Sequence, residues 1–235
     1  MVVLLCAAWS SVMTATQINR RPDTARVALA ATLAALASLI SISGLSVPFP
    51  LMPFLRFDAA EIPDALAFLL LGPTGGLAVT TIHWMTLNLS ASFDPVVGPT
   101  MKFMAVFATL LGMYVGTLFL GRGSSDRRSF LSLLVWGTAL RFLIMLPVTF
   151  ALYYLVFPAT YLTFAAKALA AAGIMVSGQL ATAIAVTLAT ALFNVMHAVI
   201  TISASWGLYR TAGRMKVIRP ALDWFGQRLG RVEAG

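Results

Sequence analysis

Charged side chains are scarce in this sequence. They make up 10% of its 235 residues, whereas hydrophobic residues make up 60% and the mean hydropathy is +0.90. An ordinary soluble domain carries about a quarter charged residues. The composition therefore excludes a soluble monomer and predicts an integral membrane protein with one helical domain.

Cysteine and the common motifs of enzymes are also nearly absent. Cys6 alone cannot form an internal disulfide or a cysteine-only metal site. The sequence lacks the G-x-x-x-x-G-K-[ST] loop of ATPases, the H-E-x-x-H motif of zinc proteases and the G-x-S-x-G motif of serine hydrolases. We therefore expect no resident metal or cofactor and no ATP hydrolysis by this chain.

Acidic residues are half as numerous as basic ones, 8 against 16, which gives a net charge of +8. Such an excess can indicate nucleic-acid binding, but only if the basic residues share one accessible face. Here they lie between apolar runs, so we expect membrane lipid and not nucleic acid around this chain.

Six apolar runs are candidates for membrane spans. The predicted fold class is an all-α membrane protein, a bundle of six transmembrane helices within residues 25–209. The second span is short and ends at Gly72-Pro73, after which Gly75-Gly76 permits a tight reversal into the third. The predicted spans are 25–45, 60–71, 77–89, 100–120, 130–157 and 180–208.

The distribution of basic residues predicts the orientation of this bundle. Cytoplasmic segments of membrane proteins collect Lys and Arg. Six spans with both termini inside place the basic tail, 210–235, in the cytoplasm. A further span within 161–178 would move that tail outside, so we expect this segment to be an outer, partly helical connection.

Residues 1–24 are predicted to be an interfacial or loose lead. Its apolar part precedes Arg20 and Arg21, whereas a secretory signal has basic residues first. Sixteen helical residues would rise about 24 Å, less than the hydrocarbon core. An additional span is the alternative.

A proline-rich stretch joins the first two predicted spans. Pro48, Pro50 and Pro53 each lack an amide proton and restrain the residue before them, so a helix cannot run smoothly through 47–53. We expect a structured loop that caps the outer face of the bundle.

Several polar side chains fall within the apolar runs. Ionisable groups at membrane depth cost roughly 2.5 to 3.5 kcal/mol each, so they face partners or cavities. His83 and Arg141 are two such residues, and Asn194 and His197 share one helical face. They either hold helices together, with Arg141 paired to carbonyls or to an acid on a neighbouring span, or bind a ligand.

Small residues four positions apart recur in the first span. Ala30 and Ala34 form one such pair, and Ala31 and Ala35 form another. Spacing of this kind lets a second helix approach closely, whether from this chain or from a separate membrane subunit.

One enzymatic alternative remains at this point. Ser43 or Ser177, each followed by glycine, could act with His197 as an intramembrane serine protease. The flanking residues match no nucleophile motif, so this hypothesis is remote.

Three runs and one motif resemble a known family, the substrate-binding S components of energy-coupling-factor (ECF) vitamin transporters. The sequence resembles the riboflavin-specific branch in particular, whose last motif reads F-N-x-x-K. This resemblance extends from Arg26 to Arg214. The matching segments are Pro48-Phe49-Pro50, Leu55-Arg56-Phe57-Asp58-Ala59-Ala60-Glu61-Ile62-Pro63, Gly72-Pro73-Thr74-Gly75-Gly76 and Phe193-Asn194-Val195-Met196-His197.

The resemblance implies a multi-pass protein of a prokaryotic cell membrane that binds a vitamin near the outer face. It also implies a transmembrane T component and two ATPase subunits as partners, and transport by toppling of the S component. The docking face would comprise Ala30, Ala34, Ala31 and Ala35. ATP hydrolysis would then occur on the partner chains, in agreement with the missing motif.

The expected ligand is riboflavin or a related flavin, and another vitamin or heterocycle is the alternative. Asn194 and His197 would hydrogen-bond the ligand, Trp84 and Tyr153 would wall it, and the loop from Phe49 to Asp58 would gate it. The full set of expected site residues is Asn194, His197, Trp84, His83, Tyr153, Lys102, Phe49, Leu51, Phe57 and Asp58.

Departures from the riboflavin branch bear on the ligand. His83-Trp84 replaces Lys-Asn, Tyr153 aligns with an asparagine, and Gly98 to Phe103 differs from G-E-x-x-N-F. His197 replaces lysine, and because an unperturbed histidine titrates near pH 6.5, we expect binding to vary between about pH 5.5 and 8. The pattern of hydrogen bonds to the ligand must therefore differ.

Overall fold

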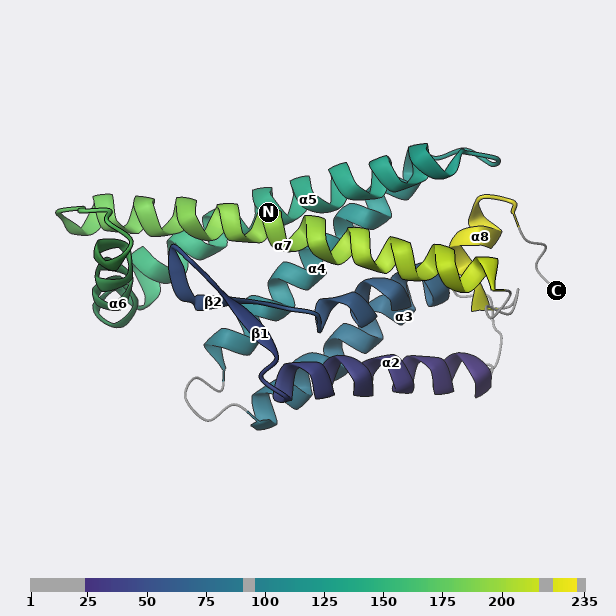
Figure 1. Ribbon diagram of the computed structural model, residues 1–235, viewed down its shortest axis with the longest axis horizontal. Helices are drawn as coiled ribbons and strands as arrows, with labels where there is room; N and C mark the ends of the chain where they lie inside the picture. Colours follow the sequence, from purple (N-terminus) through teal and green to yellow (C-terminus); the bar gives the residue numbers. More distant parts are fainter. Residues whose placement is uncertain (1–23, 91–95, 216–221, 232–235) are drawn as a thin grey trace.

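The computed structural model describes residues 24–90, 96–215 and 222–231, which form a bundle of helices with a small β-hairpin at one end (Figure 1). The predicted lead, 1–24, lies outside the described residues except for Thr24. Five segments are long and apolar enough to cross a membrane, so the predicted count of six spans is not confirmed. These segments are α2 (Thr24–Ile42), α3 (Glu61–Ser90), α4 (Val97–Leu118), α5 (Asp126–Ala151) with its π-helical extension η1 (Leu152–Val156), and α7 (Gln179–Arg214).

Helix α3 reverses direction at Gly72 and therefore contains two of the predicted spans. Gly72 has φ 85°, a left-handed conformation that suits glycine. Beyond it the chain runs back, because Asp64 and His83 are 19 residues apart yet their side chains lie within 2.9 Å. The predicted tight reversal is confirmed. The first arm, 61–71, rises only about 16 Å, so it is half the length of a span.

The predicted capping loop is a β-hairpin, which corrects the sequence-based expectation. Strands β1 (Ser46–Phe49) and β2 (Met52–Asp58) pair antiparallel, with Val47 opposite Phe57. A two-stranded ladder has free outer edges, where a proline without an amide proton costs no hydrogen bond. The Arg56 side chain ties the two strands together by donating from Nε to Ser46 Oγ at 2.7 Å.

A short helix, α6 (Pro158–Ala171), lies at the same end of the bundle as the hairpin (Figure 1). Pro158 begins it, as suits a residue whose missing amide proton has no helical partner there. The rings of Phe54 on β2 and Phe164 on α6 lie 5.4 Å apart. The expected helical connection between the last two spans is therefore present and packs on the hairpin.

The opposite end carries most of the basic residues. Helix α8 (Trp224–Arg228), within the predicted tail, packs on the bundle through buried Phe225. Arg26 donates to the carbonyl oxygen of Leu71 at 2.9 Å, next to the reversal in α3. Clustered charge at this end agrees with the predicted arrangement, although which side faces the cytoplasm stays a prediction.

Helices α4 and α5 approach each other very closely along a line of glycines. A Cβ built on Gly112 would collide with the backbone carbonyl of Trp136, and one built on Gly116 would collide with that of Ser132. Gly137 lies on the α5 side of the same contact. Small residues at this seam let the two backbones pack directly, as is common between membrane helices.

Candidate functional site

An ion pair lies buried at the middle of the bundle. Arg141, near the middle of α5, donates from both terminal nitrogens to the carboxylate of Glu61 at the start of α3, at 2.5 and 3.1 Å. Each residue is 1% exposed. The structural interpretation of Arg141, an acid partner on a neighbouring span, is confirmed. A buried pair of this kind is strongly destabilised when one member is removed.

Asn194 and His197 of α7 join this ion pair. The Asn194 side-chain oxygen accepts from Arg141 Nε at 3.0 Å. His197 Nε2 donates to the carbonyl oxygen of Asp58 at 3.1 Å, since a carbonyl can only accept. His197 Nδ1 faces the Glu61 carboxylate at 3.5 Å and has no hydrogen-bond partner among the described residues. The two side chains share one helical face, as their spacing predicted.

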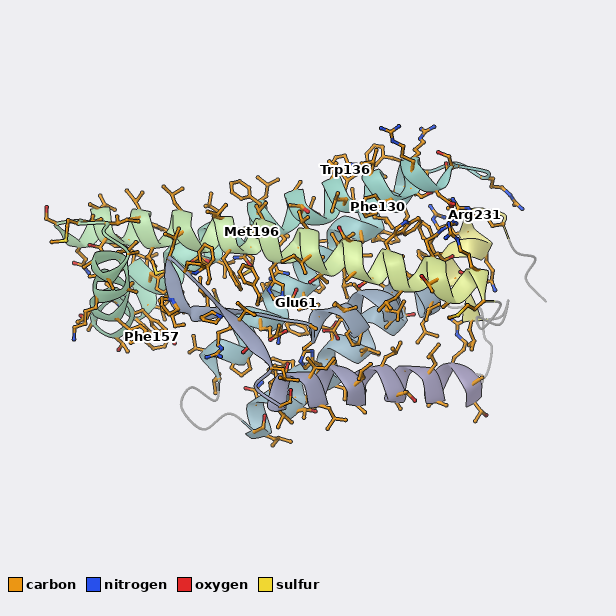
Figure 2. The ribbon with its side chains drawn as sticks, viewed as in Figure 1. Glu61, Phe130, Trp136, Phe157, Met196 and Arg231 are labelled. Atoms are coloured by element: carbon orange, nitrogen blue, oxygen red, sulfur yellow. The ribbon has the colours of Figure 1, made fainter. Side chains whose placement is uncertain are left out.

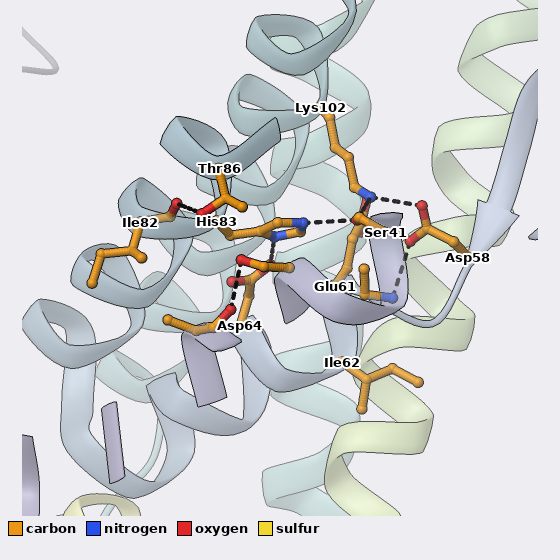
Figure 3. A network of polar contacts seen from close by, with 12 residues as sticks. Ser41, Asp58, Glu61, Ile62, Asp64, Ile82, His83, Thr86 and Lys102 are labelled. Atoms are coloured by element: carbon orange, nitrogen blue, oxygen red, sulfur yellow. Dashed lines mark hydrogen bonds and ion pairs between the residues drawn. The ribbon is translucent and has the colours of Figure 1, made fainter. Parts of the chain in front are cut away.

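A second polar cluster joins α2, α3 and α4 to the end of the hairpin (Figure 3). Lys102 donates to Asp58 Oδ2 at 2.6 Å and to Ser41 Oγ at 2.9 Å. His83 Nδ1 lies 2.9 Å from Asp64 Oδ2, and its Nε2 lies 2.8 Å from Ser41 Oγ. If His83 is neutral, Nδ1 donates to the carboxylate and Nε2 accepts from the Ser41 hydroxyl.

Asp58 belongs to both clusters and also lies just before the start of α3. Its Oδ1 accepts from the backbone N–H of Ala60 at 3.0 Å, which satisfies a donor next to the first turn of α3. Its Oδ2 binds Lys102 and its carbonyl binds His197. The last residue of the hairpin is therefore held from three directions at the centre of the molecule.

Aromatic residues of the hairpin cover the Asn194 and His197 face of α7. The ring of Phe57 lies 4.7 Å from that of Phe193 and 5.6 Å from that of His197. Phe49 packs on Phe193 at 5.7 Å. In this conformation the hairpin closes directly over the two polar side chains, as the capping role predicts.

Other predicted site residues fall around this centre. Tyr153, in η1, is buried in the same apolar cluster as Phe49, and Leu51 packs against that cluster. Trp84 instead faces α4, where its Nε1 donates to Thr100 Oγ1 at 3.3 Å and its ring lies 5.7 Å from that of Phe103. Among the expected residues, Trp84 is the one for which the described contacts give no link to Asn194 or His197.

Sequence reasoning predicted Asp58 but missed two other acids of this site, Glu61 and Asp64. Both lie in the first turn of α3 and are buried, at 1% and 0% exposure. Ser41 was not singled out, although its hydroxyl bridges Lys102 and His83. Charge matching could have identified Glu61 from the sequence. A buried Arg141 requires an acidic partner, and Glu61 is an acid at the start of an apolar helix.

The structure separates the residues of the protease alternative. Ser43 is exposed and its hydroxyl donates to the carbonyl oxygen of Ile40 at 2.7 Å. Ser177 precedes α7, whereas His197 lies 18 residues into that helix, a rise of about 27 Å from its first residue. Neither serine meets His197, so the geometry provides no nucleophile and base.

The alanines of α2 divide between two faces. Ala34 is buried against Ala67 and Val79 of α3, and Ala30 packs beside them. Ala31 and Ala35 are exposed. Packing within the chain therefore accounts for Ala30 and Ala34. Ala31 and Ala35 are the two that remain accessible for docking a partner.

Comparisons with known proteins support a relationship of fold. No family model matches the sequence. The chain is 33% identical over 82 residues to the riboflavin transporter RibU of Staphylococcus aureus (strain TCH60), a match that covers 35% of this chain and 42% of that relative. This chain thus spans less than half the length of the curated relative it matches.

A solved structure agrees over a longer stretch. The S component of a bacterial ECF transporter superposes with a TM-score of 0.58, covering 82% of this chain and 98% of that one at 22% identity. The resemblance predicted from the sequence is therefore confirmed at the level of the fold.

Proposed function

We propose that this chain, which has the fold of an S component of an ECF transporter, is the substrate-binding membrane subunit of a vitamin uptake system. Riboflavin or a related flavin is the first candidate ligand, supported by the partial match to a riboflavin transporter. A T component and two ATPase subunits would complete the transporter. The chain itself binds and delivers, and no step in this role requires it to catalyse a reaction.

The observation that carries this proposal is the closure of the hairpin over Asn194 and His197. Phe57 and Phe49 place flat rings beside α7, and His197 Nδ1 lies among polar groups without a hydrogen-bond partner. Binding sites for small heterocycles are mainly apolar, with a few placed polar groups. A flat ligand would displace one or both rings and form hydrogen bonds with Asn194 and His197.

A second candidate is an S component for a different vitamin or heterocycle. Lys102 is engaged by Asp58, His83 by Asp64, and Trp84 by Thr100 of α4. These are the positions at which the sequence departs from the riboflavin branch. The set of groups left for a ligand therefore differs from the pattern that the riboflavin branch would present.

Purified protein in detergent distinguishes these candidates. Bound flavin would make the preparation yellow, and added riboflavin would lose fluorescence on binding. We expect saturable binding that weakens roughly 5- to 150-fold in Asn194→Ala, since a lost hydrogen bond that leaves a buried partner unsatisfied costs about 1 to 3 kcal/mol. Ser43→Ala, an exposed position, serves as the matched control. A colourless preparation that does not bind riboflavin would favour the second candidate.

The transport role has its own test. We expect the chain to co-purify with a T component and two ATPases when these are expressed together, and uptake to require ATP. Uptake or ligand turnover by the chain alone would contradict a subunit that depends on an external ATPase.

A further inference from the structure

A groove of about 450 Å³ runs along the first turns of α5, at the basic end of the bundle. Arg127 and Arg128 line one end, and Leu131, Val135 and Trp136 line the other. Its lining residues, on the first turns of α5, include none of the residues of the hairpin or of the two buried clusters. It therefore belongs to a different part of the surface from the candidate vitamin site.

The groove is graded from charged to apolar along one helical face. Arg128, Leu131 and Val135 follow each other at spacings of three and four residues, which aligns them on α5. They cover about 10 Å of helix length. Trp136 forms the apolar wall and stacks on Phe119 of α4, with ring centres 4.8 Å apart and planes 1° from parallel.

The two arginines have no acid to neutralise them in the part of the chain that the structure describes. Asp126, their neighbour, already binds Arg210 at 2.5 Å and Arg231 at 2.8 Å. Arg127 and Arg128 are both exposed. Two positive charges therefore stand uncompensated at one end of an apolar groove.

We propose that this groove binds an anionic phospholipid. The phosphate lies between Arg127 and Arg128, and an acyl chain follows Leu131, Val135 and Trp136 toward the middle of the membrane. Basic residues at the ends of membrane helices attract anionic lipids, and the apolar half of the groove suits an acyl chain and not a free anion.

The position of α5 keeps this groove in contact with lipid. Helices α2 and α5 lie at opposite edges of the bundle (Figure 1). Figure 2 shows Trp136 at the edge that α5 forms. A partner that docks on the exposed face of α2 would leave the groove open, so the bound lipid would stay with the subunit in the assembled transporter.

Lipid retention measured by native mass spectrometry tests this proposal. The full chain is reconstituted in vesicles with equal amounts of phosphatidylglycerol and phosphatidylcholine and then extracted in mild detergent. We expect the wild-type chain to retain phosphatidylglycerol preferentially, and Arg127→Gln/Arg128→Gln to lose this preference by roughly fivefold per arginine. Equal retention of both lipids by the wild-type chain would overturn the proposal.

The matched control is Arg214→Gln/Arg228→Gln, which removes the same charge from exposed positions at the same end. We expect it to retain phosphatidylglycerol as the wild type does. An equal loss in both double variants would show a general effect of charge and would overturn a specific site. Val135→Ser tests the apolar half with both arginines intact, and it should also reduce retention.

Soluble glycerol phosphate separates a lipid site from an anion site. This probe carries the charge of the headgroup without acyl chains. We expect millimolar concentrations to leave the bound phosphatidylglycerol in place. Displacement by the soluble anion at low molar ratio would overturn the role assigned to Leu131, Val135 and Trp136.

Discussion

The carbonyl oxygen of Asp58 accepts a hydrogen bond from His197 Nε2 at 3.1 Å, which joins the last residue of the hairpin to the middle of α7. The two residues are 139 positions apart in the sequence. The covering of the candidate site is therefore attached to the helix that carries its polar groups, and a change at His197 affects both.

Replacing His197 by alanine should loosen the hairpin and speed the exchange of ligand. Loss of the hydrogen bond to Asp58, worth about 0.5 to 1.5 kcal/mol, should by itself raise ligand dissociation by roughly 2- to 13-fold. Stopped-flow fluorescence measures this rate. An unchanged rate would show that the contact with Asp58 does not hold the hairpin closed.

The pH dependence expected for His197 remains a prediction. Binding in the wild-type chain should change between about pH 5.5 and 8, because histidine is the side chain that ordinarily titrates there. His197→Gln keeps a donor for the Asp58 carbonyl and does not titrate, so its binding should be flat over this range. Identical profiles for the two proteins would remove His197 from the ligand contacts.

The Glu61 and Arg141 pair should show strong coupling in a double-mutant cycle. Glu61→Gln or Arg141→Met alone leaves a buried group of the pair without its charged partner and should lower the free energy of unfolding by about 3 to 5 kcal/mol. The double variant should lose clearly less than the sum of the two. Denaturant unfolding in detergent micelles measures all four proteins, and additive losses would contradict direct pairing.

Two glycines provide a matched test of the seam between α4 and α5. Gly112→Ala should destabilise the protein by about 1 to 3 kcal/mol because its methyl group would meet the backbone of Trp136. Gly207→Ala, in α7 with nothing within 4 Å of its Cβ, should be neutral or stabilising. Thermal unfolding compares them, and equal shifts would argue against close backbone packing at Gly112.

Leucine substitutions on the two faces of α2 should have different effects on folding and on assembly. Ala35→Leu lies on the exposed face, so it should leave folding intact and reduce co-purification with the T component. Ala34→Leu would overfill the contact with α3 and should lower stability by about 1 to 3 kcal/mol. Normal assembly and uptake by Ala31→Leu/Ala35→Leu would show that partners dock elsewhere.

Much of the bundle could be predicted because its signals are local. Apolar runs located α2, α4, α5 and α7, and the Gly72-Pro73 break located the reversal. The prolines near Pro48 excluded a helix but could not separate a loop from a strand. That distinction depends on pairing across the hairpin, for which alternation of apolar and polar residues gave no signal.

The candidate site was predicted only in part because its contacts span long sequence separations. Asn194 and His197 could be placed together, since both lie on one helix. Glu61 and Arg141 are 80 residues apart, and no periodic pattern relates them. Spacing along a helix therefore predicted which side chains share a face, whereas the choice of partners required the packing of α3 against α5 and α7.

The first arm of α3 is only half the length of a span. Strand β2, which directly precedes it, therefore provides the rest of the chain's path across the bundle at this point. Strand β2 has β1 as its ladder partner, so its outer edge presents backbone groups without a sheet neighbour. Hydrocarbon cannot satisfy such groups, whereas water or surrounding protein can. The outer edge of β2 is therefore expected to face water or protein and not lipid hydrocarbon, so a polar ligand could reach Asp58 along it without crossing the hydrocarbon.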